Sequence, residues 1–370
     1  MNIVDTILCS SLVLIVAIQG LYHFYFFRKL AAYRIPPPNH SSPPVSIVIC
    51  AHNEAQNLEA FLPLICAQEY PEFEVIVVND RSADHTSTVV LKYAQQYPHL
   101  HILDIKETPE GKDHKKYALE HGVEQARHSW ILVTDADCYP TSDQWIKHMA
   151  GTIKDGTQLV LGYSPYQKQN TLVNKFVQID TFLTAVQYFS YALAGYPYMG
   201  VGRNSMYKKS LFLNAKKRKE YQHITGGDDD LFMKDVANKE NVSICLHDTA
   251  HMISMPPVNF KAWFRQKTRH LSVGKYYSGK IKLLLAGYQL STLFYYIISL
   301  YLLIEINEIW WLLVLISLRT CLIFINFKNI RCTLKSFFSI KWFFMLETLY
   351  TLLIGFIGAI GVFYKRIRWK

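Results

Sequence analysis

The chain has 370 residues, enough for one large domain or two ordinary ones, and 39 Lys and Arg against 29 Asp and Glu give a formal net charge of +10. This charge suits a protein lying against an anionic lipid surface, whereas nucleic-acid binding is excluded because no recognised module or stripe of Lys and Arg accompanies it. Seven scattered cysteines without a C-x-x-C pair are typical of a reduced, cytosol-facing protein rather than of a disulfide framework or a zinc site.

The first element is an apolar stretch at 6–27, which contains no Asp, Glu, Lys or Arg and is long enough to span a bilayer. Basic residues follow directly: Arg28, Lys29 and Arg34. The positive-inside rule therefore places the next segment in the cytoplasm. Because the basic and small flanks of a cleaved signal peptide are absent, we expect a membrane anchor at 1–34, followed by a stiff Pro-rich linker at 35–44.

Strands then alternate with helices. The apolar runs predict strands at 45–50, 73–78, 101–103 and 130–134, with helices near 55–66, 86–97 and 115–126. This alternation predicts an α/β domain with a parallel, doubly wound sheet. Neither G-x-G-x-x-G after the first strand nor G-x-x-x-x-G-K-[ST] is present, so a dinucleotide site and a P-loop are not expected.

Two carboxylates, Asp135 and Asp137, follow the fourth strand. Ligands gather outside the carboxyl ends of the strands in such sheets. An Asp-x-Asp pair there offers hard oxygen ligands to Mg²⁺ or Mn²⁺, which complete their shell with substrate phosphates. The pattern indicates a metal–diphosphate site; the alternative is a pair of turn aspartates that close a strand.

Three segments together, at 46–54, 77–84 and 134–137, resemble the motifs of family 2 glycosyltransferases of the GT-A fold. The resemblance extends over roughly 45–277 and rests on the order and spacing of the motifs. It implies a nucleotide diphospho-sugar donor, a UDP- or GDP-sugar, bound over the first half of the sheet. Within that resemblance the nucleoside would lie by Ala51, Asn53 and Glu54, the base or ribose by Asp80, and the diphosphate with its metal between Asp135 and Asp137.

Simpler structural explanations exist for several of these residues. Glu54 could be a first-turn helix acid favoured by the helix dipole, and Asp80 a turn residue that ends a strand. Phosphate could be neutralised by lysines that are otherwise merely solvated: Lys112, Lys115 and Lys116. At 200–207, two glycines allow close backbone approach to a ligand, which makes Arg203 a candidate contact; a buried strand with a surface Arg is the alternative.

The segment 225–232 resembles the family's acidic motif, which carries the catalytic base. Three adjacent carboxylates repel one another, so at least one should have a raised pKa, as a general base for a sugar hydroxyl requires. The family motif is usually Glu-Asp, and the register leaves the base open between Asp228 and Asp229. An acidic helix N-terminus is the alternative.

A basic, aromatic segment follows at 259–270 and resembles the family's Q-x-x-R-W motif. Gln266 and Arg269 share one helix face; the resemblance implies that the Arg faces the donor diphosphate. The Trp that would contact the acceptor sugar is replaced by His270, which argues against chain elongation. An amphipathic interfacial helix is the alternative, and both can hold.

The C-terminal part is apolar again. Spans are predicted at about 283–304 and 309–327, joined by an acidic turn at 305–308. Arg319 in the second span is costly unless it faces protein or a polar path. The last apolar stretch, 342–364, is interrupted by Glu347 and three glycines; it could span the bilayer or form a re-entrant hairpin that returns the basic residues 365–370 to the cytoplasm.

The sequence thus predicts an integral protein of the cell (inner) membrane with its catalytic domain in the cytoplasm. The expected division is a transmembrane anchor (1–34), a linker (35–44), a GT-A domain (45–258), an interfacial helix region (259–282) and a transmembrane region (283–370). The expected activity is inverting, metal-dependent transfer of a sugar to a lipid-linked or polysaccharide acceptor among the membrane lipids. The alternatives are a processive polysaccharide synthase and a non-catalytic scaffold; a transporter would need more spans.

Overall fold

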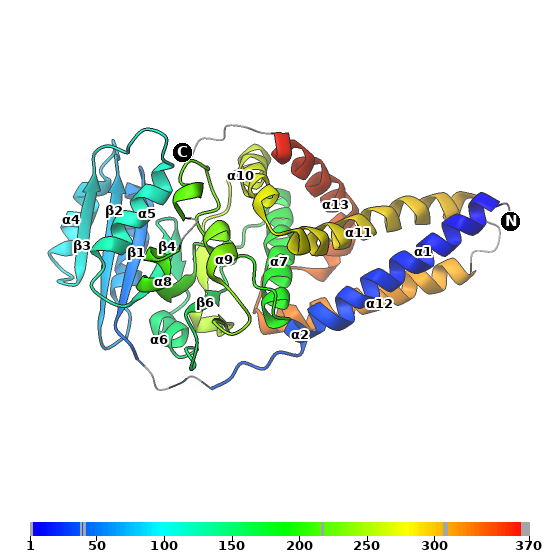
Figure 1. Cartoon of the computed structure of the whole chain (residues 1–370), viewed down its shortest axis with the longest axis horizontal. Helices are drawn as coiled ribbons and strands as arrows, with labels where there is room; N and C mark the ends of the chain where they lie inside the picture. Colours follow the sequence, from blue (N-terminus) through cyan, green and yellow to red (C-terminus); the bar gives the residue numbers. More distant parts are fainter. Residues whose placement is uncertain (1–2, 38, 40–41, 216–217, 306–309, 364–370) are drawn as a thin grey trace.

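The computed structural model describes residues 3–37, 39, 42–215, 218–305 and 310–363. An α/β domain forms one end of the molecule and a bundle of long helices extends from the other (Figure 1). The strands are β1 (Val45–Ala51), β2 (Phe73–Asp80), β3 (Leu100–Ile105), β4 (Trp130–Asp135), β5 (Cys138–Pro140), β6 (Leu159–Gly162), β7 (Ser205–Lys208), β8 (Val242–Cys245) and β9 (Met252–Ser254). The α-helices of the α/β part are α3 (Ala55–Cys66), α4 (Thr86–Ala94), α5 (His114–Gln125), α6 (Trp145–Ala150), α7 (Leu172–Leu193), α8 (Lys209–Leu213), α9 (Asp230–Val236) and α10 (Phe260–Ser272).

The main sheet has seven strands in the order β3-β2-β1-β4-β7-β6-β8, and β5 pairs with β9 in a small second sheet. The four predicted strands correspond to β1 to β4, and these are parallel as expected. The prediction of a wholly parallel sheet is wrong at β7, which runs antiparallel to both β4 and β6. The long helix α7 does not return the chain as a parallel crossover. It delivers the chain to the carboxyl edge of β4, where β7 begins.

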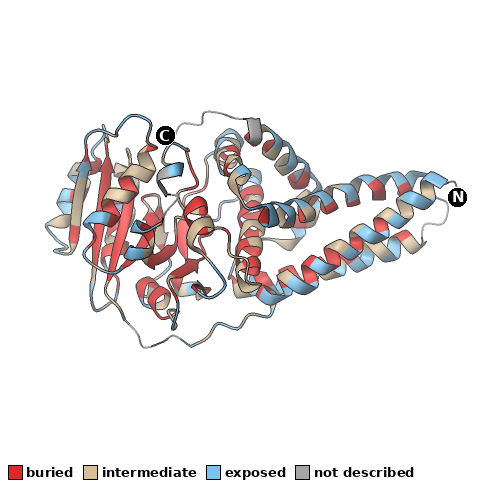
Figure 2. Ribbon diagram, in the orientation of Figure 1, coloured by how far each residue is buried: buried red, intermediate tan, exposed pale blue. Residues whose placement is uncertain are grey.

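The central strand β1 is buried on both faces, as its continuous apolar run predicts. Successive side chains point to opposite faces: Val45, Ile47 and Ile49 pack on the side of α3, α4 and α6, whereas Val48 and Cys50 pack on the side of α5 and α7. The second of these cores continues without a break into the helices of the C-terminal part. The sheet is therefore rigidly joined to the helical region, as the contiguous buried residues in Figure 2 show.

Within the described residues, four helical segments are long and apolar enough to cross a membrane: Ile3–Ala31, Gly279–Glu305, Trp310–Thr333 and Ile340–Gly361. The first consists of α1 (Ile3–Leu21), a π-helical turn η1 (Tyr22–Phe27) and α2 (Arg28–Ala31); the others are α11 (Gly279–Glu305), α12 (Trp310–Thr333) and α13 (Ile340–Phe363). Figure 1 shows α1, α11 and α12 running side by side away from the sheet. The remaining elements are the 3₁₀ turns η2 (Arg218–Tyr221), η3 (Asp248–Ala250) and η4 (Val273–Tyr276).

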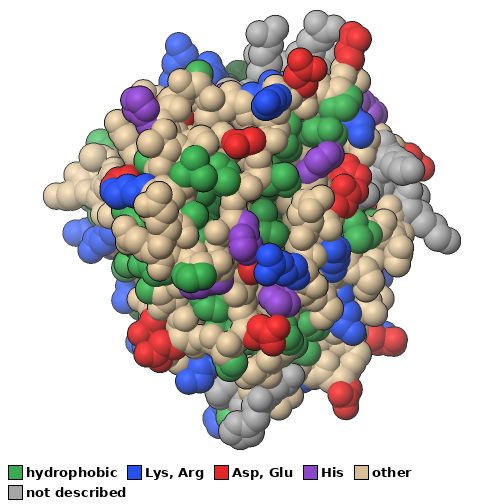
Figure 3. All heavy atoms as spheres, turned by 90° about the vertical axis from the view of Figure 1, so that its left-hand side faces the viewer, with side chains coloured by type: hydrophobic (Ala, Val, Ile, Leu, Met, Phe, Trp, Pro, Cys, Tyr) green, Lys and Arg blue, Asp and Glu red, His purple; other side chains and the backbone are tan. Residues whose placement is uncertain are grey.

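The outward faces of these helices carry large exposed apolar side chains, such as Leu14 (62% exposed), Leu300 (63%) and Val314 (66%). Extended apolar surface of this kind is rare on soluble proteins and matches the bilayer interior. By contrast, Figure 3 shows the end of the α/β domain farthest from the bundle, with charged side chains of both signs scattered over it. The predicted membrane segments therefore carry the apolar outer surface that the interior of a bilayer requires.

The last apolar stretch forms one continuous helix, α13, so a hairpin bent at its glycines does not occur in the described residues. Figure 1 shows α13 crossing obliquely beside α10, and Glu347 of α13 contacts Tyr296 of α11 and Arg319 of α12. One stripe of α13 is exposed and apolar: Met345, Leu349, Leu352 and Phe356. The basic residues 364–370 and, apart from Glu305, the predicted acidic turn lie outside the described residues.

Candidate active site

The carboxyl edge of the sheet brings most of the predicted site residues together. Ala51 pairs with Asn79, next to Asp80, and Cys50 pairs with Asp135 across the neighbouring strands. Arg203 lies at the same edge because β7 begins there, with Ser205 opposite Val133 of β4. The strand order reverses between β1 and β4. Open α/β sheets bind ligands at the carboxyl ends of the strands beside such a reversal.

The loops after β1 and β2 are joined by side-chain hydrogen bonds. Asn53 adopts a positive φ of 56°, its amide N–H donates to Ser82 Oγ, and its Oδ1 accepts from the Ala83 N–H. The carboxylate of Glu54 accepts a hydrogen bond from Asn57. These contacts hold the loops after β1 and β2 rigidly together on the side where a nucleoside is expected. We call the surface that these two loops form the ledge.

Asp80 is fully buried, and both of its carboxylate oxygens accept hydrogen bonds from the Arg81 guanidinium, with Nε at 2.8 Å. The Arg81 side chain is 29% exposed. A ligand on this ledge would therefore meet the Arg81 guanidinium before the Asp80 carboxylate. Arg81 is a residue that sequence reasoning passed over, although it stands next to the motif aspartate.

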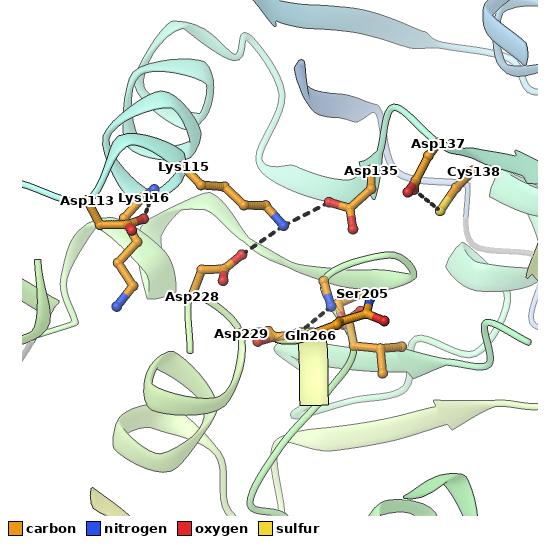
Figure 4. A network of polar contacts seen from close by, with 12 residues as sticks. Asp113, Lys115, Lys116, Asp135, Asp137, Cys138, Ser205, Asp228, Asp229 and Gln266 are labelled. Atoms are coloured by element: carbon orange, nitrogen blue, oxygen red, sulfur yellow. Dashed lines mark hydrogen bonds and ion pairs between the residues drawn. The ribbon is translucent and has the colours of Figure 1, made fainter. Parts of the chain in front are cut away.

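Lys115 lies at the centre of the site. Its Nζ is 2.8 Å from Asp135 Oδ1 and 3.3 Å from Asp228 Oδ2, so it bridges the two acidic motifs (Figure 4). Burial lowers the pKa of Lys115, but the two carboxylates outweigh it and hold that pKa well above its usual value. Lys115 is therefore a permanent cation placed between β4 and the acidic segment.

The acidic segment reaches this position through two glycines in the left-handed region, Gly226 (φ +84°) and Gly227 (φ +70°). A Cβ on Gly227 would lie 2.8 Å from Val273 Cγ1, so the tight turn excludes larger residues as well. Beyond the turn, Asp229 caps α9, and the Gly202 N–H donates to its Oδ2 at 2.6 Å. The Asp230 Oδ2 accepts from Tyr277 OH at 2.7 Å.

The three carboxylates differ in protonation. Burial raises the pKa of Asp228, but Lys115, Lys116 and Arg269 outweigh it and lower that pKa to about 2. Burial and the neighbouring Asp228 raise the pKa of Asp229 to about 6. Burial and then the neighbouring Asp229 raise the pKa of Asp230 well above its usual value. One member of the cluster is thus a fixed anion, while its neighbour can exchange a proton near neutral pH.

Helix α10 closes the site from the membrane side. Its Gln266 Nε2 donates to Tyr166 OH at 2.9 Å, and the Arg203 guanidinium stacks on the same Tyr166 ring with Cζ 4.4 Å from the centroid. The Arg203 Nη1 is buried without a hydrogen-bond partner. Arg269 approaches the glycine turn: a Cβ on Gly226 would lie 3.3 Å from Arg269 Cγ.

These elements enclose a cavity of about 420 Å³. The predicted residues that line it are Lys115, Asp135, Arg203, Asp228, Asp229, Gln266, Arg269 and His270. Lining residues that sequence reasoning missed include Tyr166, Asp180, Tyr198 and Tyr277, which belong to no motif, and Lys267, which lies between Gln266 and Arg269. Ala51, Asn53, Glu54 and Asp80 do not line the cavity; they lie at the ends of β1 and β2 and in the loop after β1, where Ala51 and Asp80 are fully buried and Asn53 is exposed.

Two predicted residues stand outside this cavity. Lys112 lies with its Nζ 5.2 Å from the Tyr117 ring centroid and does not line the cavity. Asp137 is on the far side of the β4–β5 turn, where its Oδ1 accepts from the Cys138 thiol (Figure 4). Lys116, also considered as a phosphate ligand, donates to the Tyr221 and Ile224 carbonyls and fixes the loop before the glycine turn.

The carboxyl end of β4 offers the donor set that Mg²⁺ or Mn²⁺ prefers, two carboxylates separated by one residue. In the described part of the chain, no three His, Cys, Asp or Glu side chains gather closely enough to hold an ion by themselves. Magnesium-type sites commonly use one or two carboxylates and complete the shell with substrate phosphates. Asp135 lines the cavity and Asp137 does not, so an ion shared with a diphosphate would be held on the cavity side by Asp135.

Comparison with known proteins agrees with this geometry. The model of the family described as Glycosyl transferase family 2 matches residues 46–214. The chain is similar to the probable glycosyltransferase YdaM of Bacillus subtilis (strain 168), with 26% identity over 268 residues, 68% of this chain and 60% of YdaM. It is also similar to poly-beta-1,6-N-acetyl-D-glucosamine synthase of Staphylococcus aureus (strain COL), with 24% identity over 247 residues, 65% of this chain and 55% of the synthase. The chain thus spans less than two thirds of the length of these relatives.

Among solved structures, the chain resembles mannosyltransferase PcManGT from Pyrobaculum calidifontis, solved in complex with GDP-Man and Mn²⁺. The TM-score is 0.62 at 16% identity, and the likeness covers 97% of this chain and 98% of that one. Similarity at this level establishes the fold, so the predicted GT-A type of α/β sheet with added long helices is confirmed.

Proposed function

Residues 46–214 belong to glycosyl transferase family 2, and from this premise we propose that the protein transfers a sugar from a nucleotide diphospho-sugar to an acceptor held at the membrane. The donor nucleoside binds on the ledge formed by Ala51, Asn53, Glu54 and the Asp80–Arg81 pair. The donor diphosphate extends from there towards Asp135. This direction follows the carboxyl edge of the sheet, where the three strand ends are adjacent.

One observation carries the proposal: Lys115 contacts both Asp135 and Asp228. The residue expected beside the diphosphate and the residues expected to activate the acceptor thus face one enclosed cavity. A scaffold that had kept only the fold would have no need to bury three adjacent carboxylates against a lysine, since unpaired buried charge is costly. The arrangement supports catalysis over the scaffold alternative.

The proposed mechanism is inversion by a single displacement. Asp229, with its raised pKa, accepts the proton of the acceptor hydroxyl. The acceptor oxygen bonds to the anomeric carbon while the bond from that carbon to the diphosphate oxygen breaks. The nucleoside diphosphate leaves with the electron pair, and the sugar retains its new bond to the acceptor.

The departing charge meets several cations of this chain. Arg269 faces the acidic turn, Lys115 remains protonated between its two carboxylates, and Arg203 has an unused buried N–H donor. Preorganised donors of this kind stabilise charge that develops in the transition state. A divalent ion held by Asp135 and Asp137 would add further neutralisation of the diphosphate.

A processive polysaccharide synthase is the second candidate, favoured by the likeness to the Staphylococcus aureus synthase. Continuous extrusion of a polymer requires a path along the membrane helices. In the described residues, the cavity is lined by α11 and α13 but by no residue of α1 or α12. His270 in place of a Trp also argues for single transfer, as the sequence predicted.

The proposed topology keeps the catalytic domain in the cytoplasm, where basic residues follow the first membrane segment. Lys328 and Arg331 lie near the C-terminal end of α12, which is the end nearer the domain. This placement agrees with the positive-inside rule. The division into an anchor, a linker, a GT-A domain, an interfacial region and a membrane region follows the boundaries expected from the sequence.

The test is a donor screen on the full chain in nanodiscs with lipid extract as acceptor. Release of nucleoside diphosphate is followed for a panel of UDP- and GDP-sugars with Mg²⁺, Mn²⁺ or chelator. We expect release from one donor, dependent on metal and lost in Asp137→Ala and in the Asp228→Ala/Asp229→Ala double variant. Absence of release from every donor by folded protein would favour the scaffold.

A further inference from the structure

The active-site cavity continues beyond the α/β domain and reaches two membrane helices. Its lining includes Leu285, Ala286 and Gln289 of α11 and Ile354, Gly355 and Gly358 of α13. These positions fall within the segments that are long and apolar enough to span a bilayer. The catalytic carboxylates and the membrane zone therefore share one cavity.

The membrane end of this cavity is framed by small side chains. Ala286 and Gly355 are both exposed, and a Cβ added at Gly355 or Gly358 would meet no atom within 4 Å. In contrast, a Cβ added at Gly361, one turn further along α13, would lie 3.2 Å from the Ser272 backbone nitrogen. The glycines at 355 and 358 thus leave open space rather than permit close helix packing.

The inner end of the cavity is polar and incompletely satisfied. Asp230 is 7% exposed, and its Oδ1 has no hydrogen-bond partner among the described residues. Buried polar atoms without partners are rare in proteins and commonly mark the place of a ligand group. Asp230 also lines the cavity, so the unpartnered oxygen is available to a hydroxyl group that enters it.

The cavity combines charged and apolar lining. Its carboxylates include those of β4 and the acidic segment, and its apolar side chains include Leu271, Leu285 and Ile354, the last two on membrane helices. A ligand that matches both kinds of lining has a hydroxylated headgroup and an apolar chain. A water-soluble sugar or a polymer of sugars would leave the apolar half unmatched.

We propose that a membrane lipid with a hydroxylated headgroup enters the cavity sideways between α11 and α13, its apolar chain lying against Gly355 and Gly358. Its headgroup hydroxyl then lies beside Asp229 and Asp230 while the chain stays in the bilayer. This inference rests on the proposed function and specifies the acceptor class and its route. The lipid never leaves the membrane, so no soluble domain needs to extract it.

The test uses a photoactivatable probe, an alkyl glycoside with a diazirine on the carbons next to the sugar, in nanodiscs of phosphatidylethanolamine and phosphatidylglycerol. The full chain is compared with Gly355→Leu/Gly358→Leu, which fills the open space at the membrane end. The matched control is Gly20→Leu, a helical glycine of α1 whose added Cβ also meets nothing within 4 Å and which does not line the cavity. Leucine is the better helix former at all three positions. Because Gly20 is buried, thermal unfolding of each variant is compared with that of the parent before labelling.

Peptide mapping should find the probe attached to Met199, Leu271 or Tyr277 in the parent and in Gly20→Leu. The double variant should lose this inner labelling by at least about tenfold, because the introduced side chains occupy the entrance. Labelling of outward residues of α1 such as Leu14 should be equal in all three proteins and reports correct insertion. Inner labelling that is absent in the parent, or undiminished in the double variant, overturns the proposed route.

Nucleoside diphosphate release by the same samples separates this inference from the proposed function. Donor turnover in the parent with no inner labelling contradicts the lipid route alone. Inner labelling that the double variant abolishes, without donor turnover in any sample, upholds the route and contradicts the transferase.

Discussion

Asp229 is the residue whose protonation should control the reaction rate. A base must be unprotonated to act, and burial beside Asp228 raises the Asp229 pKa to about 6. The rate should therefore be full above that pH and fall as the pH drops below about 6. Asp229→Asn should reduce kcat by about 10²- to 10⁴-fold with little change in donor KM.

The pH–rate profile of Asp228→Asn is the matched comparison. Asp228 has its pKa lowered to about 2, so it is an anion across the working range. Asp228→Asn removes the charge that helps to raise the Asp229 pKa, so the acidic limb should remain and move to lower pH. The base would be reassigned to Asp228 if Asp229→Asn stayed active and kept the acidic limb.

Lys115 is expected to control donor binding. Lys115→Met would leave Asp135 and Asp228 facing each other where a diphosphate has to bind. Loss of one member of a buried charged set costs about 2 kcal/mol or more, which corresponds to a rise in donor KM on the order of 30-fold.

Lys112→Met is the control for this measurement because Lys112 stands outside the cavity beside Tyr117. Steady-state kinetics with varied donor should show Lys112→Met close to the parent. Equal losses in the two variants would restore Lys112 to the donor site, as the sequence pattern suggested, and would contradict the placement of Lys115.

At the scale of elements, Asp180 determines how α10 sits against α7 and α13. Its carboxylate contacts Lys267 Nζ at 2.6 Å, Trp263 Nε1 at 3.1 Å and Tyr350 OH at 2.9 Å. The Asp180 and Lys267 side chains are each 11% exposed. One carboxylate thus joins the domain, the helix that carries Arg269, and a membrane helix.

Asp180→Ala should lower the free energy of unfolding by about 3 kcal/mol, because it leaves Lys267 and two hydrogen-bond donors buried without a partner. Tyr350→Phe removes a single hydrogen bond and should cost about 1 kcal/mol. Thermal unfolding in detergent, followed by Trp fluorescence, measures both. The proposed role of Asp180 in holding α7, α10 and α13 together would be wrong if Asp180→Ala were no less stable than Tyr350→Phe.

Local sequence patterns predicted β1 to β4 and the helices between them because β1, β2 and β4 contain apolar runs buried on both faces, and the partly buried edge strand β3 follows a helix in the same alternation. The short strands β6, β7 and β8 have ordinary composition, and the antiparallel direction of β7 depends on the path of α7, which no local pattern encodes. Site residues within motifs were predictable. Asp180 was not, because it lies inside a long helix and acquires its partners only through folding.

The continuity of α13 through three glycines was also beyond the sequence. Glycine lowers helix stability in water, which suggested a bend, but a helix in or against a bilayer keeps its backbone hydrogen bonds because no water competes for them. The open space at Gly355 and Gly358 became visible only with the neighbouring helices in place.

At the scale of the whole molecule, one buried ion pair holds the membrane helices together. Arg319 of α12 is 3% exposed, its Nη2 lies 2.7 Å from Glu347 Oε1 of α13, and its Nε donates to Gln19 of α1. Tyr296 of α11 donates to the same glutamate. Arg319 thus faces protein. This is one of the two surroundings in which the sequence analysis expected an arginine in a membrane span to be tolerated.

Glu347→Leu should destabilise the helical region by about 3–5 kcal/mol because it leaves the arginine buried and unpaired, whereas Arg319→Met/Glu347→Leu should recover most of that loss. Resistance to unfolding by SDS in mixed micelles measures both variants. A double variant no more stable than Glu347→Leu alone would contradict a simple pairing role.

We propose that the whole molecule is a transferase that adds one sugar to a lipid acceptor drawn from the membrane. The measurement that tests this most directly is product analysis after incubation of the full chain in nanodiscs with the labelled donor that supports turnover. We predict label in a single lipid-extractable species, lost in Asp229→Asn. A ladder of water-soluble products would contradict the account and establish a processive synthase instead.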